Sequence, residues 1–216
     1  MDVVQFADRQ TVRATYWMSA AVVLVNIFIP LSVPLTVVDV LSAAGWATMA
    51  WALHLIADKD ARIPPLKWMA VVFLTVQVAC VTASHLIGEV RTPAGIRTWL
   101  SPASVLAVPI TPLHIIFTWR LYGLVMDLAV ALQSPALRVE AQWTRRVLVT
   151  MQLLLPCAAC VAVLVPPVAL LFMPATIIAL LTAIALGLMV VGELRRVVKR
   201  AMGSKEAYEK AGELEG

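Results

Sequence analysis

Residues 174–200 read PATIIALLTAIALGLMVVGELRRVVKR, and this stretch decides the fold class. Almost all side chains of residues 174–192 are apolar, and roughly 20 such residues suffice for a helix to cross a bilayer. Four basic residues follow at once: Arg195, Arg196, Lys199 and Arg200. Basic residues gather at the cytoplasmic end of membrane helices, where they meet anionic headgroups. The stretch therefore predicts a transmembrane helix that ends at a cytoplasmic surface, with these four residues in contact with lipid.

The composition of the whole chain agrees with this interpretation. Of 216 residues, 61% are hydrophobic and 14% are charged, and the mean hydropathy is +0.88. Soluble domains average about 45–50% apolar and about 25% charged residues. These figures exclude a disordered chain, a coiled coil, a secreted disulfide scaffold and a soluble enzyme with a polar surface. A polytopic membrane protein remains.

Six stretches have the length and apolar character of a membrane span. They cover about 14–31, 34–57, 68–88, 101–118, 147–170 and 174–192. Short uncharged turns join the first span to the second and the fifth to the sixth, so we expect an all-α fold of three hairpins. The domain boundaries that follow are a six-span bundle over 1–192 and a basic, then mixed-charge cytoplasmic tail over 193–216.

The basic residues are distributed unequally between alternate loops. Of the 17 lysines and arginines, 15 fall on one side of the expected bundle, and only Arg91 and Arg97 fall on the other. The positive-inside rule then predicts that both termini are cytoplasmic. The same asymmetry explains the net charge of +4, so a nucleic-acid partner is not required.

The apolar stretch 101–132 is too long for one simple span and leaves two alternatives. In the first, the span is 101–118, Arg120 lies at the inner interface, and the following residues lie along the cytoplasmic surface or extend the helix. In the second, the span is 111–132, and Arg120 lies near mid-membrane, two turns from Asp127. An arginine at the membrane centre costs about 2.5–3.5 kcal/mol on insertion scales, so we favour the first alternative.

Few ionisable side chains fall inside the expected spans, and each is a candidate for function. Asp39 and His85 lie at a similar depth toward the outer face, so they could form a pair. His54 and His114 lie toward the inner face, and two layers of titratable groups could support a proton relay. The alternatives are that Asp39 caps a helix start or reaches water, and that the histidines are polar anchors at the interfaces.

Two cofactor patterns are weaker. His54 and His114 could be axial ligands of a b-type haem, but no second histidine pair or attachment motif accompanies them. Cys157 and Cys160 form C-A-A-C in the middle of a span, where a thiolate is disfavoured, so we interpret them as packing residues behind Pro156. We expect no metal and no cofactor. The familiar hydrolase, metalloprotease and nucleotide-binding motifs are absent and the loops are short, so we expect no enzyme.

The sixth span has one face of small residues. They recur every four residues: Ala175, Ala179, Ala183 and Gly187. Such small-xxx-small repeats let two helices approach closely in lipid. The pattern predicts close packing within the bundle or, alternatively, a homo-oligomer contact.

Four segments of the first half of the chain are similar to a known family. They are PLTVVD at 34–39, the basic break at 58–67, TASHLIG at 82–88 and SPASVLAVPITPLH at 101–114. Together they resemble the small multi-pass membrane proteins of actinobacterial conjugative plasmids, of the plasmid-spread type. The resemblance covers about half of the chain, through Asp39, His85 and His114, and Val40 stands where a glycine follows the aspartate in that pattern. It implies a role in plasmid transfer.

Three functions therefore remain as hypotheses for a protein of the bacterial inner membrane. The main one is a channel or transporter for a proton, small ion or small solute that uses Asp39, His85, His114 and His54. The alternative is an accessory or scaffold subunit that joins partners through the sixth span and the basic tail. A haem-binding membrane subunit is the most distant alternative.

Overall fold

The fold is all-α, as expected. The computed structural model describes the backbone of residues 6–25, 35–87, 102–164 and 166–214; its described side chains are those of 6–25, 40–79, 81–82, 111–154 and 177–204. These residues form six helices and no strand. The helices are α2 (Arg9–Val25), α3 (Leu35–Leu55), α4 (Ile63–Ile87), α5 (Pro102–Ala131), α6 (Pro135–Leu164) and α7 (Pro166–Leu214).

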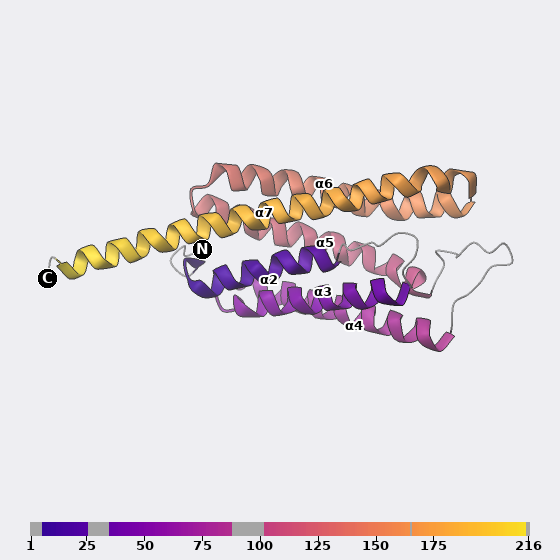
Figure 1. Ribbon diagram of the computed structural model, residues 1–216, viewed down its shortest axis with the longest axis horizontal. Coiled ribbons are helices and arrows are strands. Elements are labelled where there is room, and N and C mark those ends of the chain that lie inside the picture. The colour runs from indigo at the N-terminus through magenta and orange to yellow at the C-terminus, as the bar shows by residue number, and fades with distance from the viewer. Residues whose placement is uncertain (1–5, 26–34, 88–101, 165, 215–216) are drawn as a thin grey trace.

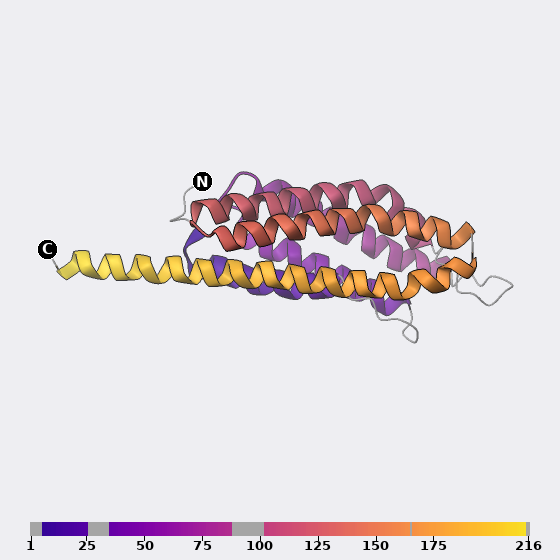
Figure 2. The same ribbon diagram turned by 90° about the horizontal axis from the view of Figure 1, so that it is seen from above.

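All six helices run along one long axis and alternate in direction (Figure 1). The beginning of α2, the α3–α4 turn and the α5–α6 turn lie at the same end of the bundle. The C-terminal part of α7 leaves the bundle at this end and continues as a single helix (Figures 1 and 2). At about 1.5 Å per residue, its 49 residues span about 74 Å, more than twice the roughly 30 Å of a bilayer hydrocarbon core.

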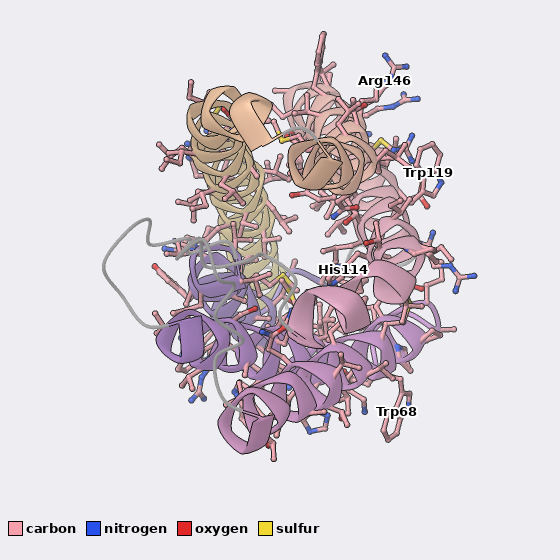
Figure 3. All side chains as sticks on the ribbon, turned by 90° about the vertical axis from the view of Figure 1, so that its right-hand side faces the viewer. Trp68, His114, Trp119 and Arg146 are labelled. Atoms are coloured by element: carbon pink, nitrogen blue, oxygen red, sulfur yellow. The ribbon has the colours of Figure 1, made fainter. Side chains whose placement is uncertain are left out.

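The helices form a closed ring. Each helix packs against the next one in the chain, and α7 returns to pack against α2. Viewed along the helix axes, the six helices surround a common centre (Figure 3). Each helix therefore has an inner face toward the other five and an outer face toward the surroundings.

The outer surface of the ring is apolar. Ile178 and Leu181 of α7 are 65% and 61% exposed, and large hydrophobic side chains are also exposed on α3, α4, α5 and α6. Two described segments are long and apolar enough to cross a membrane, Thr111–Ala131 and Ile177–Ser204; Val40–Leu55 and Ile63–Ala79 are apolar but shorter. Helices that are apolar on all sides, including the side that is exposed, suit a lipid environment.

The helix ends differ from the expected span limits where proline stands at a boundary. The prediction that the fifth span extends to 170 is wrong, because α6 ends at Leu164 and α7 begins at Pro166. Proline is favoured in the first turn of a helix, where its missing N–H would have no partner. The same preference extends α4 back to Ile63, so that Pro64 and Pro65 lie in its first turn.

Two other helices continue beyond the limits that the sequence indicated. Helix α5 runs unbroken past Arg120 to Ala131, which is the helical extension that the first alternative for this stretch allows. Helix α7 crosses the expected domain boundary between 192 and 193 without a break. Leu194, Val197 and Val198 are buried, so the bundle continues beyond residue 192.

The α5–α6 turn is short because its backbone closes α5 with hydrogen bonds. Gln133 has a left-handed backbone (φ 52°), and the Ser134 N–H donates to the Ala129 carbonyl at 2.8 Å. This arrangement is the Schellman ending of a helix. Pro135 then starts α6, and the Arg138 N–H bonds the Ser134 carbonyl. The turn holds α5 and α6 together as an antiparallel hairpin.

Candidate functional site

His114 lies inside the ring, in an aromatic cluster. Its imidazole stacks on Trp46 of α3, with ring centroids 5.2 Å apart and planes at 13°, and lies 4.1 Å from the ring of Phe73 in α4. Phe117 packs edge-on against both of these aromatic rings. In the view along the helices, His114 lies toward the middle of the bundle, whereas Trp68, Trp119 and Arg146 point outward (Figure 3).

One face of α5 carries polar groups toward the centre of the ring. His114, Thr118 and Tyr122 are four residues apart, so they share this face. Thr118 accepts a hydrogen bond of 2.8 Å from the Gln152 side-chain amide of α6. The Tyr122 hydroxyl reaches α7, since a Cβ atom built on Gly187 would lie 3.7 Å from it. The face thus touches α3, α6 and α7.

Two buried polar atoms near this face have no hydrogen-bond partner in the described part of the chain. They are Nε2 of His114 and Oε1 of Gln152, and both are inaccessible to solvent. A buried polar atom without a partner costs about 1–3 kcal/mol. Such atoms in native proteins are commonly bonded by ordered water or by a ligand. We therefore regard His114, Thr118 and Gln152 as the candidate functional site.

The structure does not bring His54 to His114. His54 is exposed near the end of α3 and lies against Trp51, with ring centroids 5.7 Å apart. It follows Trp46, the partner of His114, by eight residues, which is about 12 Å along the helix. The two imidazoles therefore do not share a coordination pocket. Within the described side chains, no three histidine, cysteine, aspartate or glutamate residues gather as a metal site would require.

Four other candidates fall where the structure does not describe side chains. Asp39 lies in α3 and His85 in α4, which are neighbouring helices, and Cys157 and Cys160 lie in α6. Their side chains are outside the described residues, so the predicted Asp39–His85 pair and the packing interpretation of the cysteines remain predictions.

Ion pairs connect the turns at the end of the bundle where α2 begins. Asp8 accepts hydrogen bonds from the Thr11 N–H at 2.7 Å and from Lys59 Nζ at 2.5 Å, which ties α2 to the α3–α4 turn. The Lys59 side chain is only 8% exposed. Burial favours a higher pKa for Asp8, but the bonds from Lys59 and Thr11 outweigh it and hold the pKa below its ordinary value.

Arg62 forms a second ion-pair cluster at the same end. Its guanidinium bonds both oxygens of Asp60, at 3.0 and 2.9 Å, and also bonds Asp127 near the end of α5. The hydrogen bonds from Arg62 lower the pKa of Asp60, and the bonds to Asp60 and Asp127 raise the pKa of Arg62. Asp127 therefore lies level with the polar α3–α4 turn.

The four basic residues predicted to contact lipid have different surroundings. Arg195 turns toward α2, where it bonds Thr15 and Ser19 and lies over the ring of Tyr16, 3.7 Å from its centroid. Arg196 is exposed and pairs with Glu193. Lys199 and Arg200 are exposed, and Lys199 Nζ lies 5.8 Å from the Tyr16 ring.

The described part of the small-residue face of α7 packs inside the ring. Ala183 and Gly187 are buried, Ala179 is half-buried, and the Ala175 side chain lies outside the described residues. A Cβ atom on Gly187 would lie 2.7 Å from Cγ1 of Val22 in α2. This packing corresponds to the intramolecular alternative for these residues.

Comparisons of the chain with protein-family models, with curated proteins and with solved structures find no match. The site must therefore be interpreted from its own chemistry. Sequence reasoning found His114 but missed Thr118, Gln152 and Tyr122. The four-residue spacing from His114 through Thr118 to Tyr122 was a usable signal on α5, whereas nothing in the sequence indicated that Gln152 faces them.

Proposed function

We propose that this protein is a six-span membrane protein with both termini in the cytoplasm, and that its helix ring carries a proton or a small polar solute past His114. The six antiparallel helices and the apolar outer surface support the membrane part of this proposal. The polar face inside the ring supports the transport part.

A belt of aromatic side chains supports the orientation. We use the name inner belt for the exposed tyrosine and tryptophans toward the end where α2 begins. Its members are Tyr16, Trp17, Trp51, Trp68, Trp119 and Trp143. Tryptophan and tyrosine concentrate at membrane–water interfaces, and lysine and arginine lie on the cytoplasmic flank. Three belt residues carry a basic group over the ring: Arg195 over Tyr16, Lys67 over Trp68, and Arg145 over Trp119.

The inner belt also favours the first alternative for the fourth span. Trp119 belongs to the belt, so the neighbouring Arg120 lies at the interface rather than at mid-membrane. Asp127 pairs with Arg62 beside the polar α3–α4 turn. Either charge would be costly inside lipid, so this pair belongs outside the hydrocarbon core. Helices α5 and α6 have 30 residues each, about 45 Å, and can therefore cross the bilayer and continue beyond it as a hairpin.

Reporter fusions test the six-span orientation. A fluorescent protein at the C-terminus should fluoresce, and alkaline phosphatase inserted after residue 133 should be inactive, because both positions would be cytoplasmic. Phosphatase inserted between residues 91 and 97 should be active. Active phosphatase after residue 133 would overturn the orientation and the number of spans.

The single observation that carries the transport proposal is the pair of unpartnered atoms on His114 and Gln152, beside Thr118. In lipid no bulk water satisfies such groups, so polar residues within membrane proteins face a water-filled interior or a solute path. An imidazole can accept and donate a proton, and the amide and hydroxyl groups can hold water or a small polar solute next to it.

Flux through proteoliposomes tests this function. The purified protein is reconstituted with an internal pH-sensitive dye, and proton flux is followed under an imposed potential from about pH 4 to pH 8. We expect flux above that of protein-free liposomes. His114→Phe, which keeps the aromatic packing against Trp46, should reduce it at least about tenfold, a typical effect of losing a proton-transfer group.

His54→Gln is the matched control, because His54 is exposed and outside the ring. It should leave the flux unchanged. Asp39→Asn tests the separate prediction that Asp39 belongs to the same path. If the wild-type protein moves no protons, no small cations and no small polar solutes over this pH range, the transport proposal is wrong.

A scaffold subunit is the second candidate, and the extension of α7 favours it. This helix continues beyond the bundle, where it could contact a partner (Figure 2). The role in plasmid transfer implied by the resemblance belongs to this candidate. Isolation of a stoichiometric partner with the full chain, after mild detergent extraction of native membranes, would support it.

A further inference from the structure

Arg195 is a half-buried cation that no carboxylate neutralises within the described part of the chain. Its guanidinium bonds the Thr15 carbonyl at 3.1 Å, the Thr15 hydroxyl at 3.3 Å and the Ser19 hydroxyl at 2.7 Å, all through Nε and Nη2. These partners are neutral. They orient the guanidinium but do not balance its charge, and Nη1 takes part in none of these bonds.

A second cation approaches the ring of Tyr16, and two more lie on the same side of α2. Lys199 lies one turn beyond Arg195 on α7 and also approaches Tyr16. On α2, Arg9 and Arg13 precede Tyr16 by seven and three residues, so they lie on its side of the helix, and both are exposed. The nearby acids have other partners, since Asp8 pairs with Lys59 and Glu193 pairs with Arg196.

We propose that the seam between α2 and α7 at Tyr16, Arg195 and Lys199 binds the phosphate of an anionic phospholipid from the inner leaflet. The α2–α7 seam, as we name it, lies in the inner belt, which is the depth of lipid headgroups. Nη1 of Arg195 and the ammonium of Lys199 can donate to phosphate oxygens, and basic pockets between helices on the cytoplasmic side hold anionic headgroups. This proposal depends on the membrane placement proposed above but not on transport.

Binding of lipid to the purified full chain in a neutral detergent tests the site. Native mass spectrometry measures how many phosphatidylglycerol molecules remain bound and with what affinity, and phosphatidylcholine and inorganic phosphate serve as the two comparison ligands. We expect one phosphatidylglycerol site with at least about fivefold preference over phosphatidylcholine, consistent with the contribution of one or two cations near a membrane surface. Inorganic phosphate should not displace the lipid.

Variants separate this site from diffuse attraction. Lys199→Gln and Arg195→Gln should each weaken phosphatidylglycerol binding at least about fivefold, and Arg195→Lys should weaken it less. Arg196→Gln is the matched control, because it removes the same charge from the next residue, which pairs with Glu193. It should change the affinity less than twofold. Should Arg195→Gln fail to fold, Lys199→Gln and Arg195→Lys still decide the question.

Three results would overturn the proposal. Equal weakening by Arg195→Gln, Lys199→Gln and Arg196→Gln would indicate diffuse attraction by the whole basic end. Equal binding of phosphatidylcholine would remove the requirement for an anionic headgroup. Displacement by inorganic phosphate would identify a site for free phosphate instead of lipid. None of these results depends on flux, so they are distinguishable from failure of the transport proposal.

Discussion

A Cβ atom added to Gly45 in α3 would lie 2.6 Å from the backbone nitrogen of Val25 in α2, so these helices are as close there as a glycine permits. Gly45→Ala should lower stability by about 1–3 kcal/mol, because the backbone of α2 cannot move away without loss of neighbouring packing. Unfolding of the purified protein by an anionic denaturing detergent, followed by tryptophan fluorescence, measures the change.

Gly123→Ala provides the control for that substitution. A Cβ atom on Gly123 of α5 meets no other atom within 4 Å. Alanine is favoured over glycine inside a helix by about 1 kcal/mol, so this variant should be as stable as the wild type or slightly more so. If both variants destabilise the protein equally, the close α2–α3 approach does not have the importance that we assign to it.

The ion pairs of Asp8 and Asp127 should differ in their importance. Asp8→Asn removes the charged partner of the buried Lys59 and should cost about 1–3 kcal/mol. Asp127→Asn breaks a pair in which both side chains are about half exposed, and Arg62 keeps Asp60, so it should cost about 1 kcal/mol or less. The same unfolding measurement compares them, and a larger effect of Asp127→Asn would contradict the assignment.

Acid should destabilise the end of the bundle where α2 begins. The pKa values of Asp8 and Asp60 lie below their ordinary value of 3.8 in the folded protein. Their contribution to stability is therefore complete above that value and is lost as the pH falls through the lowered values. The fall in melting temperature that these two aspartates cause should begin only below about pH 4. The Asp8→Asn, Asp60→Asn double variant should show a shallower fall, and an unchanged slope would contradict this origin.

The hydrogen bond between Gln152 and Thr118 should appear in a double-mutant cycle. Thr118→Val leaves the buried Gln152 amide without its acceptor, whereas Gln152→Leu removes the amide together with its unpartnered oxygen. We expect the first to destabilise the protein and the double variant to recover part of that loss. The coupling should be about 0.6 kcal/mol, a typical value between membrane helices. Strictly additive effects would exclude this bond.

The helical class was predictable because each apolar stretch is about as long as a bilayer is thick. Six helical stretches were expected, and six helices are present in the described residues. Their limits were less predictable. Pro166 begins α7, although the expected fifth span continued to 170 and the sixth began at 174, because proline is compatible with the first turn of a helix.

The candidate site was predictable only in part. His54 and His114 are both single histidines in apolar stretches, and the sequence gives each the same status. In the structure His54 is exposed beside Trp51, and His114 lies among Trp46, Phe73 and Phe117. Which one faces inward depends on the rotation of α3 and α5 about their axes. On α5 the spacing of His114, Thr118 and Tyr122 indicates this rotation, whereas α3 is apolar on all sides and carries no such pattern.

The sequence by itself determined that the chain is helical and apolar, because long apolar stretches of this length favour helices. It also predicted which end of the bundle is cytoplasmic, from the distribution of basic residues. The tertiary structure decided which polar groups meet. Gln152 reaches Thr118 from 34 residues away, and Arg195 reaches Thr15 from 180 residues away. Such contacts depend on the closure of the helix ring, where side-chain shape sets the rotation and depth of each helix.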